Sequence, residues 1–263
     1  VSSGGEYPVS LTVHDKWVYV LNAAGDGSIS GFRLVEGQLK PLAKSTRSLF
    51  AATPADGAQP NILEAPAQVG FTPDGSMLVI TDKGAVSGVG RLLVFKIDRS
   101  GRPSRTFVST PTAAPVPFAF TFDRFGHLVV VDASAGSISS YQFNRNGSLS
   151  LLGAVTNGQA AVCWIDSNGK YIFTDNTGSG TISALKPSVK GSPVLLDATA
   201  AITGPDTLPL DMSISRNGRF LYSLETGAGA IGQYRINSNG TLSFIGTLTG
   251  LPVIGGFQGI EAN

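Results

Sequence analysis

Short apolar runs alternate with turn-forming clusters along this chain, and the same order of runs recurs five times. One unit begins at Ala65, turns at Pro73-Asp74-Gly75 and returns as the apolar run 77–81. Turns rich in Asp, Asn and Gly supply the positive-φ positions that tight hairpins need. A Gly-rich loop leads on to a strand of alternating polarity such as 28–32, and a second Gly turn opens a fourth strand. Each unit therefore predicts four antiparallel strands.

Four antiparallel strands per repeat are typical of a propeller blade, and no run has helical period with capping signals. The predicted fold class is all-β: a β-propeller of four-stranded antiparallel blades, as one domain over residues 1–263. A β-sandwich with coincidental spacing is the competing interpretation. The expected blades are 7–44, 65–110, 116–156, 159–197 and 208–250, followed by a closing strand at 255–263.

Five blades plus one strand indicate part of a larger ring. The segment 255–261 looks like the first strand of a sixth unit, and propellers often close by completing one terminal blade with the other terminus. The chain also starts abruptly at Val1 without Met. We therefore expect an N-terminal segment, and any targeting signal with it, to be missing; a genuine smaller ring stays open.

Composition narrows the function classes. Charged residues make up 14% of the chain and the formal net charge is +1, which argues against a nucleic-acid surface. The chain has no apolar run long enough for a transmembrane helix. Low charge suggests a secreted or periplasmic protein. The single cysteine, Cys163, lies in an apolar run and is expected to be a buried, inert thiol.

The repeats resemble the seven-bladed lactonase family, which includes 6-phosphogluconolactonase and the fungal carboxymuconate-lactonizing enzyme. The resemblance extends over nearly the whole chain and implies a seven-bladed propeller, with most of two blades expected before Val1. The residues responsible are 71–75 (FTPDG), 216–222 (RNGRFLY), 29–34 (ISGFRL) and 234–242 (YRINSNGTL).

The resemblance does not extend to the family's reactive set. Active members carry Gly-Pro-Arg-His on an inner strand and Asn-Glu at the end of the next strand. Here blade two has Ala67 and Gln68 at the Arg-His positions, and Asp82 and Lys83 at the Asn-Glu positions. The other blades also lack the set, so the Arg-His-Glu chemistry of the family is in doubt in these blades.

The second strand of each unit ends in a polar residue. In a propeller these ends lie on one face around the central channel, which we call the funnel. The side chains could bind a hydroxyl-rich ligand or a cation, or supply a general base. Alternatively, each could accept backbone N–H bonds from its own loop. The five residues are Asn22, Asp82, Asp132, Asp175 and Glu225.

Glu225 and Asp211 are the most specific candidates. Glu is a poor turn cap, so Glu225 has less structural reason to occupy this position. Asp211 matches the position of the family's His and should lie near Glu225, where two carboxyl groups could share a proton or bind a metal. Gln68 and Asp82 form the analogous pair in blade two. The predicted catalytic residues are Glu225, Asp211 and Asp82, and the predicted ligand-binding residues are Gln68, Asn22, Asp132, Asp175, Lys83 and Arg47.

Arg47 belongs to the long connection 45–63, which is longer than a blade link needs and could close over a ligand. Connection 197–208 is a second long link. Neither His14 nor His127 is expected in the funnel, so a Ser-His-Asp hydrolase is hard to build. No cofactor is required by the sequence, and a divalent cation is possible.

Two functions stay open at this stage. The first is a lactonase or cycloisomerase that hydrolyses or isomerises a small cyclic ester at the funnel. The second is a non-catalytic propeller that binds a small molecule or a protein there. The missing Arg-His-Glu set favours the second, whereas the long connections and clustered carboxylates favour the first.

Overall fold

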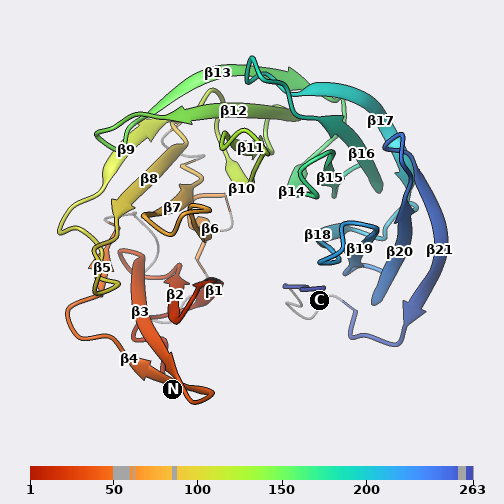
Figure 1. Ribbon diagram of the computed structural model, residues 1–263. Helices are drawn as coiled ribbons and strands as arrows, with labels where there is room; N and C mark the ends of the chain where they lie inside the picture. Colours follow the sequence, from red (N-terminus) through yellow and green to blue (C-terminus); the bar gives the residue numbers. More distant parts are fainter. Residues whose placement is uncertain (50–59, 62, 85–87, 254–258, 263) are drawn as a thin grey trace. The chain divides into compact units, whose positions relative to one another are not determined.

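The computed structural model describes residues 1–49, 60–61, 63–84, 88–253 and 259–262 (Figure 1). Within these residues every regular element is a β-strand, and the strands form five sheets in which neighbours follow chain order. The predicted all-β fold class, with blades of four antiparallel strands, is confirmed. We number the five sheets blades one to five along the chain.

The strands of each blade are as follows. Blade one has β1 (Pro8–His14), β2 (Trp17–Asn22), β3 (Ser28–Val35) and β4 (Gln38–Pro41), with β5 (Arg47–Ser48) pairing with β3. Blade two has β6 (Pro66–Phe71), β7 (Met77–Asp82), β8 (Arg91–Lys96) and β9 (Val108–Pro111). Blade three has β10 (Pro117–Phe122), β11 (Leu128–Asp132), β12 (Ser137–Phe143) and β13 (Leu149–Thr156).

The last two blades follow the same plan. Blade four has β14 (Val162–Ser167), β15 (Ile172–Asn176), β16 (Thr181–Lys186) and β17 (Val194–Ile202). Blade five has β18 (Pro209–Ile214), β19 (Phe220–Glu225), β20 (Ala230–Ile236) and β21 (Leu242–Thr249). Figure 1 shows this stepwise order from β18 to β21 in blue.

The first turn of blade two has the chemistry that the sequence predicts. In blade two the Thr72 hydroxyl donates to the Asp74 carboxylate at 2.6 Å, and the same carboxylate accepts the Ser76 backbone N–H at 3.1 Å. Gly75 has a φ of 69°, a conformation that costs a side chain energy but is open to glycine. The hairpin is therefore specified locally, by its own residues.

The chain divides into two compact units, Val1–Pro117 with Phe143–Leu149, and Phe118–Gln142 with Ser150–Asn263. In the first unit, blades one and two pack through a buried apolar cluster that includes Tyr19, Phe71 and Phe95. In the second unit, blades four and five pack through a cluster that includes Phe173 and Leu221. Apolar blade faces thus bury each other, as repeat architectures require.

Most of the expected closing strand, 255–258 and 263, lies outside the described residues. The segment 259–262 has no regular structure, but it contacts the innermost strand of blade five. The backbone N–H of Ala262 donates to the Ser213 hydroxyl at 3.0 Å. This contact places the segment beside β18 within the second unit.

Candidate functional site

The polar residue that ends the second strand of each blade pairs directly with the first residue of the third strand. In blade four this residue is Asn176, paired with Thr181, and Asp175 lies one position earlier. The prediction that Asp175 is the equivalent of Asp132 is wrong, because a shift of one residue moves a side chain to the other face of a sheet. The pairs are Asn22 with Ser28, Asp82 with Arg91, Asp132 with Ser137, Asn176 with Thr181, and Glu225 with Ala230.

In blade three this residue is tied to hydroxyl groups of the neighbouring strand. Oδ2 of Asp132 accepts hydrogen bonds from Ser137 at 3.3 Å and Ser139 at 2.5 Å, while its Oδ1 is buried without a partner. Similar contacts join Asn22 to Ser28 at 3.3 Å, and Asn176 to Thr181 at 3.0 Å and to Ser183 at 2.9 Å. In these blades the polar residue holds two strands together through side-chain hydroxyls.

Blade two replaces the hydroxyl contact with an ion pair. Nε of Arg91 donates to Oδ2 of Asp82 at 2.9 Å, and a second guanidinium nitrogen contacts the same oxygen. Burial raises the pKa of Asp82, although Arg91 and Lys83 oppose that shift by favouring the carboxylate. Lys83 is itself buried, and Gln68 is partly buried on β6. Asp82 is therefore already engaged by a cation.

Blade five departs from both patterns. Glu225 lies opposite Ala230, and the next residue on that face of β20 is Gly232. An ideal Cβ at position 232 would lie 2.3 Å from Oε1 of Glu225 and 3.2 Å from the Tyr234 hydroxyl. The longer Glu side chain thus occupies space that hydroxyl residues fill in blades three and four. Glu225 pairs with Ala230 in the sheet, but its side chain does not join the two strands through hydroxyl groups.

Asp175 faces blade five from blade four. The Ser223 hydroxyl donates to Oδ1 of Asp175 at 3.0 Å, and Oδ2 is fully buried without a partner. The residue is 0% exposed. The register places Leu21, Thr81, Val131 and Leu224 at the corresponding positions of the other blades. Asp175 therefore places a carboxyl group at a position that is apolar in three of the other four blades.

Asp211 lies on the innermost strand of blade five, paired with Leu224. Backbone N–H groups of Met212, Ile260 and Gly259 stabilise its carboxylate, yet burial dominates and raises the pKa of Asp211 to about 7. Its Oδ1 is buried without a partner. Asp211 on β18 and Glu225 on β19 therefore come from adjacent strands of one blade, and their pairing in one site stays a prediction.

Burial also controls the charge of the other two carboxyl groups. It raises the pKa of Glu225 to about 7, and it raises the pKa of Asp175 well above its usual range. The charges of Asp211 and Glu225 push the pKa of Asp175 further upward, while the hydrogen bond from Ser223 opposes this. Near neutral pH the arrangement therefore offers a neutral acid and groups able to act as bases.

Arg47 belongs to the first unit. Its guanidinium donates to the backbone carbonyls of Pro103 at 2.6 Å and Ser104 at 2.7 Å, and to those of Thr46 and Lys44. Residues 50–59 and 62 of the long connection lie outside the described residues. A ligand-binding role for Arg47 stays a prediction.

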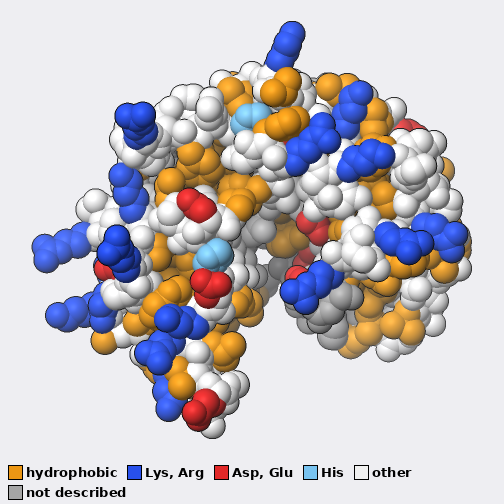
Figure 2. Space-filling view, viewed as in Figure 1, with side chains coloured by type: hydrophobic (Ala, Val, Ile, Leu, Met, Phe, Trp, Pro, Cys, Tyr) orange, Lys and Arg blue, Asp and Glu red, His pale blue; other side chains and the backbone are white. Residues whose placement is uncertain are grey.

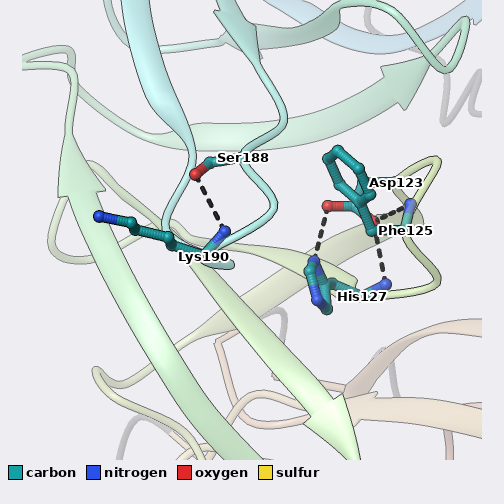
Figure 3. Close-up of polar contacts among 5 residues, drawn as sticks. All are labelled: Asp123, Phe125, His127, Ser188 and Lys190. Carbon is teal, nitrogen blue, oxygen red and sulfur yellow. Dashed lines mark hydrogen bonds and ion pairs between the residues drawn. The ribbon is translucent and has the colours of Figure 1, made fainter.

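The histidines belong to turns. Figure 3 shows Asp123 accepting the backbone N–H groups of Phe125 and His127 at 2.8 and 2.9 Å, while its other oxygen meets the His127 ring at 2.9 Å. His14 ends β1 and packs against Phe71. Neither contact involves the acidic cluster of blades four and five.

A cavity of about 490 Å³ in the second unit lies at the first turns of blades four and five, lined by Asp166, Ser213, Arg216, Glu261 and neighbouring turn residues. Both carboxylate oxygens of Asp166 accept backbone N–H groups, from Ser167 at 2.7 Å and Ile214 at 2.8 Å. The acid is thus used to join two blades.

Among the residues described, no three His, Cys, Asp or Glu side chains are grouped so that they could hold a metal ion. No described helix is long and apolar enough to cross a membrane. Figure 2 shows Lys and Arg side chains scattered over the face in view.

Sequence reasoning missed the partners of the candidate acids. Arg91, Ser223 and Tyr234 are ordinary strand residues in the sequence, and their roles arise from pairing and from packing between blades. The one available signal was in β20, where Ala230 and Gly232 stand in place of the hydroxyl residues found at 137 and 139.

Comparison with known families agrees with the resemblance that the repeats predict. Residues 123–211 match the sequence model of the family described as Lactonase, 7-bladed beta-propeller. A comparison with curated proteins found no match.

Solved structures resemble nearly the whole chain. A candidate 6-phosphogluconolactonase from Bacteroides uniformis has a TM-score of 0.72 at 18% identity, covering 92% of this chain and 72% of its own. A second from Bacteroides fragilis has a TM-score of 0.70 at 19% identity, covering 93% and 72%. The periplasmic gluconolactonase of Pseudomonas aeruginosa has a TM-score of 0.59 at 16% identity, covering 94% and 86%. At these identities the likeness shows the fold, and with the family match it supports the resemblance predicted from the repeats.

Proposed function

We propose that this chain, a lactonase-like β-propeller, hydrolyses a small cyclic ester in blade five, with Glu225 as the general base. The observation that supports the proposal is that the Glu225 side chain has no hydroxyl donor on the neighbouring strand, although Glu225 and Ala230 pair in the sheet. Where blades one, three and four tie their polar residue to hydroxyls, blade five has Ala230 and Gly232 and leaves the carboxyl group without such donors.

The chemistry follows from the two carboxyl groups of blade five. Ionised Glu225 takes a proton from water, and the water oxygen forms a bond to the ester carbonyl carbon. The ring C–O bond then breaks, and its oxygen takes a proton from neutral Asp211. Both groups have a pKa of about 7, where general acids and bases act best near neutral pH.

The substrate class comes from the family match and the neighbours. Two of the similar structures are described as candidate 6-phosphogluconolactonases and one as a gluconolactonase. A sugar lactone is therefore the first substrate to try. Asp82 is a weaker candidate base, because Arg91 holds its carboxylate.

The test is hydrolysis of gluconolactone followed in a pH-stat, with and without a divalent cation, since a cation partner is not part of the proposed steps. We expect Glu225→Gln to lower kcat by about 10²–10⁴-fold, the usual contribution of a general base. Glu6→Gln, at an exposed residue of the first unit, is the matched control. Activity of Glu225→Gln equal to that of the wild type would contradict the proposal.

A non-catalytic propeller is the second candidate, and one observation favours it. The positions that match the family's Arg and His hold Ala67 and Gln68 in blade two, and Leu210 and Asp211 in blade five. If no lactone is turned over, binding of the same lactones measured by calorimetry distinguishes a ligand-binding propeller from one that does not bind them.

A further inference from the structure

Asp166 joins blades four and five through a contact that needs no charge. Its Oδ2 accepts the backbone N–H of Ile214 on β18 at 2.8 Å. Blades one and five make the same kind of contact with a hydroxyl oxygen: Thr12 accepts an N–H of β6 at 3.3 Å, and Ser213 accepts one of segment 259–262 at 3.0 Å. All three lie opposite the residue that precedes the polar strand end by three positions, which is Tyr19, Phe173 or Tyr222. A hydroxyl would therefore suffice at position 166.

The carboxyl group of Asp166 lines the cavity of about 490 Å³ together with Glu261. This volume is in the range of small-molecule sites. None of the ion pairs among the described residues involves either acid. Burial raises the pKa of Asp166 to about 6, with a contribution from the charge of Glu261 and against the backbone N–H groups of Ile214 and Ser167. A positive charge in the cavity would therefore stabilise both carboxylates.

Donors for an anion line the same cavity. The exposed Arg216 side chain has no ion pair or hydrogen bond with the described residues. Ser213 is 5% exposed and accepts the N–H of Ala262, while the described contacts give its own hydroxyl proton no acceptor. A buried donor without an acceptor is costly, so an acceptor placed in the cavity is favoured.

We propose that this cavity binds a small zwitterion of the amino-acid class, with its ammonium group facing Asp166 and Glu261 and its carboxylate at Arg216 and Ser213. The walls carry both signs of charge without pairing them with each other, so a ligand with both charges is neutralised at both ends. A ligand with one charge leaves the opposite wall unpaired. The described lining includes neither acid of the proposed lactone site, so this is a separate function.

Three probes of similar size separate the two contacts. L-alanine carries both charges, ethylamine only the ammonium group, and propionate only the carboxylate. Each is titrated into the ¹⁵N-labelled protein while NMR follows the backbone amides of 166–168 and 213–218, which border the cavity. We expect L-alanine to bind at least about tenfold more tightly than either single-charge probe, because it keeps both charge-assisted contacts.

Two substitutions assign the two ends of the ligand. Asp166→Ser keeps an oxygen acceptor for Ile214, as Ser213 does in its own contact, and removes the charge. It should weaken L-alanine by about tenfold and leave propionate unchanged. Arg216→Gln should weaken L-alanine equally and leave ethylamine unchanged. Arg219→Gln, at an exposed residue of the same turn outside the described lining, is the matched control and should change none of the three.

The titration needs no lactone, so failure of the proposed hydrolysis leaves its result unaffected. Saturable shifts with L-alanine that weaken in both Asp166→Ser and Arg216→Gln support the proposal. Absence of saturable shifts, or an unchanged affinity in a folded Asp166→Ser protein, overturns it. Ethylamine or propionate binding as tightly as L-alanine also overturns it, because one charge would then be enough.

Discussion

At the scale of single residues, the polar residue that ends the second strand of each blade has different hydrogen-bond partners from one blade to the next. Asn176 donates to two hydroxyls and also accepts from Asn157 at 2.9 Å, so its amide is well satisfied. Asp132 occupies the same position with a carboxyl group whose Oδ1 has no partner. Burial raises the pKa of Asp132 to about 7, despite the hydrogen bonds from Ser139 and Ser137. An ionised Asp132 is therefore costly.

Asp132→Asn tests this cost through the dependence of stability on pH. Because the pKa of Asp132 in the folded protein lies above its ordinary value of 3.8, the folded state binds more protons between about pH 4 and pH 7. Stability should therefore fall as pH rises through this window. We expect Asp132→Asn to be more stable than wild type by about 4 kcal/mol at pH 8, since each pKa unit corresponds to about 1.4 kcal/mol, and similar to it at pH 4.

Urea unfolding at the two pH values measures the effect. Asp197→Asn, on an exposed position of β17, is the control. The difference in unfolding free energy between Asp132→Asn and the wild type is compared at the two pH values. An equal difference at both would show that Asp132 does not titrate in this window.

At the scale of elements, β20 makes room for the Glu225 side chain. Glycine within a strand weakens it, so its presence usually marks a close approach by another group. At Gly232 that group is the Glu225 carboxyl, 2.3 Å from an ideal Cβ. At Gly246 of the neighbouring β21 an ideal Cβ meets nothing within 4 Å.

These two glycines form a matched pair for mutation. Gly232→Ala should displace Glu225 and lower kcat/KM for a lactone by about tenfold or more, because misplacing a catalytic group by about 1 Å is enough for such a loss. Gly246→Ala should leave kcat/KM within about twofold. Steady-state kinetics of both variants provide the comparison. Equal activities would mean that the position of the Glu225 carboxyl group beside Gly232 is not needed for activity.

At the scale of the whole molecule, the two compact units have separate apolar clusters and one tryptophan each. Trp17 packs against the cluster of the first unit, and Trp164 packs against that of the second. Repeat architectures gain stability from each blade and from its contacts with neighbours. The tryptophans can therefore report on the two units separately.

Phe173→Ala removes a fully buried ring from the second cluster. We expect the substitution to lower the free energy of unfolding by about 3–5 kcal/mol, which is typical of truncating a buried Phe to Ala. The urea midpoint reported by Trp164 should fall more than the one reported by Trp17. Fluorescence of Trp17→Phe and Trp164→Phe backgrounds isolates each signal. Equal shifts at both tryptophans would instead mean that the two units unfold as one.

Much of the fold was predictable because blades are built from local rules. Turns such as Thr72 to Met77 satisfy their own hydrogen bonds, and the alternation of apolar residues sets which face of a strand is buried. The repeat also places Asp211 and Glu225 on adjacent strands of one blade, as the structure has them, while their role as acids stays a prediction. The sequence shows an acid at position 175 but not the face of the sheet on which it lies, since a one-residue shift in register decides that face.

The sequence by itself determined the all-β repeat, its turns and the polar ends of its second strands, because each depends on residues within one blade. Only the tertiary structure decided which of these residues are engaged. Arg91 forms an ion pair with Asp82, hydroxyls hold Asp132 and Asn176, and the absence of a side chain at Gly232 leaves room for the Glu225 carboxyl group. The physical reason is that burial, which sets the charge of each carboxyl group, comes from residues distant in the chain.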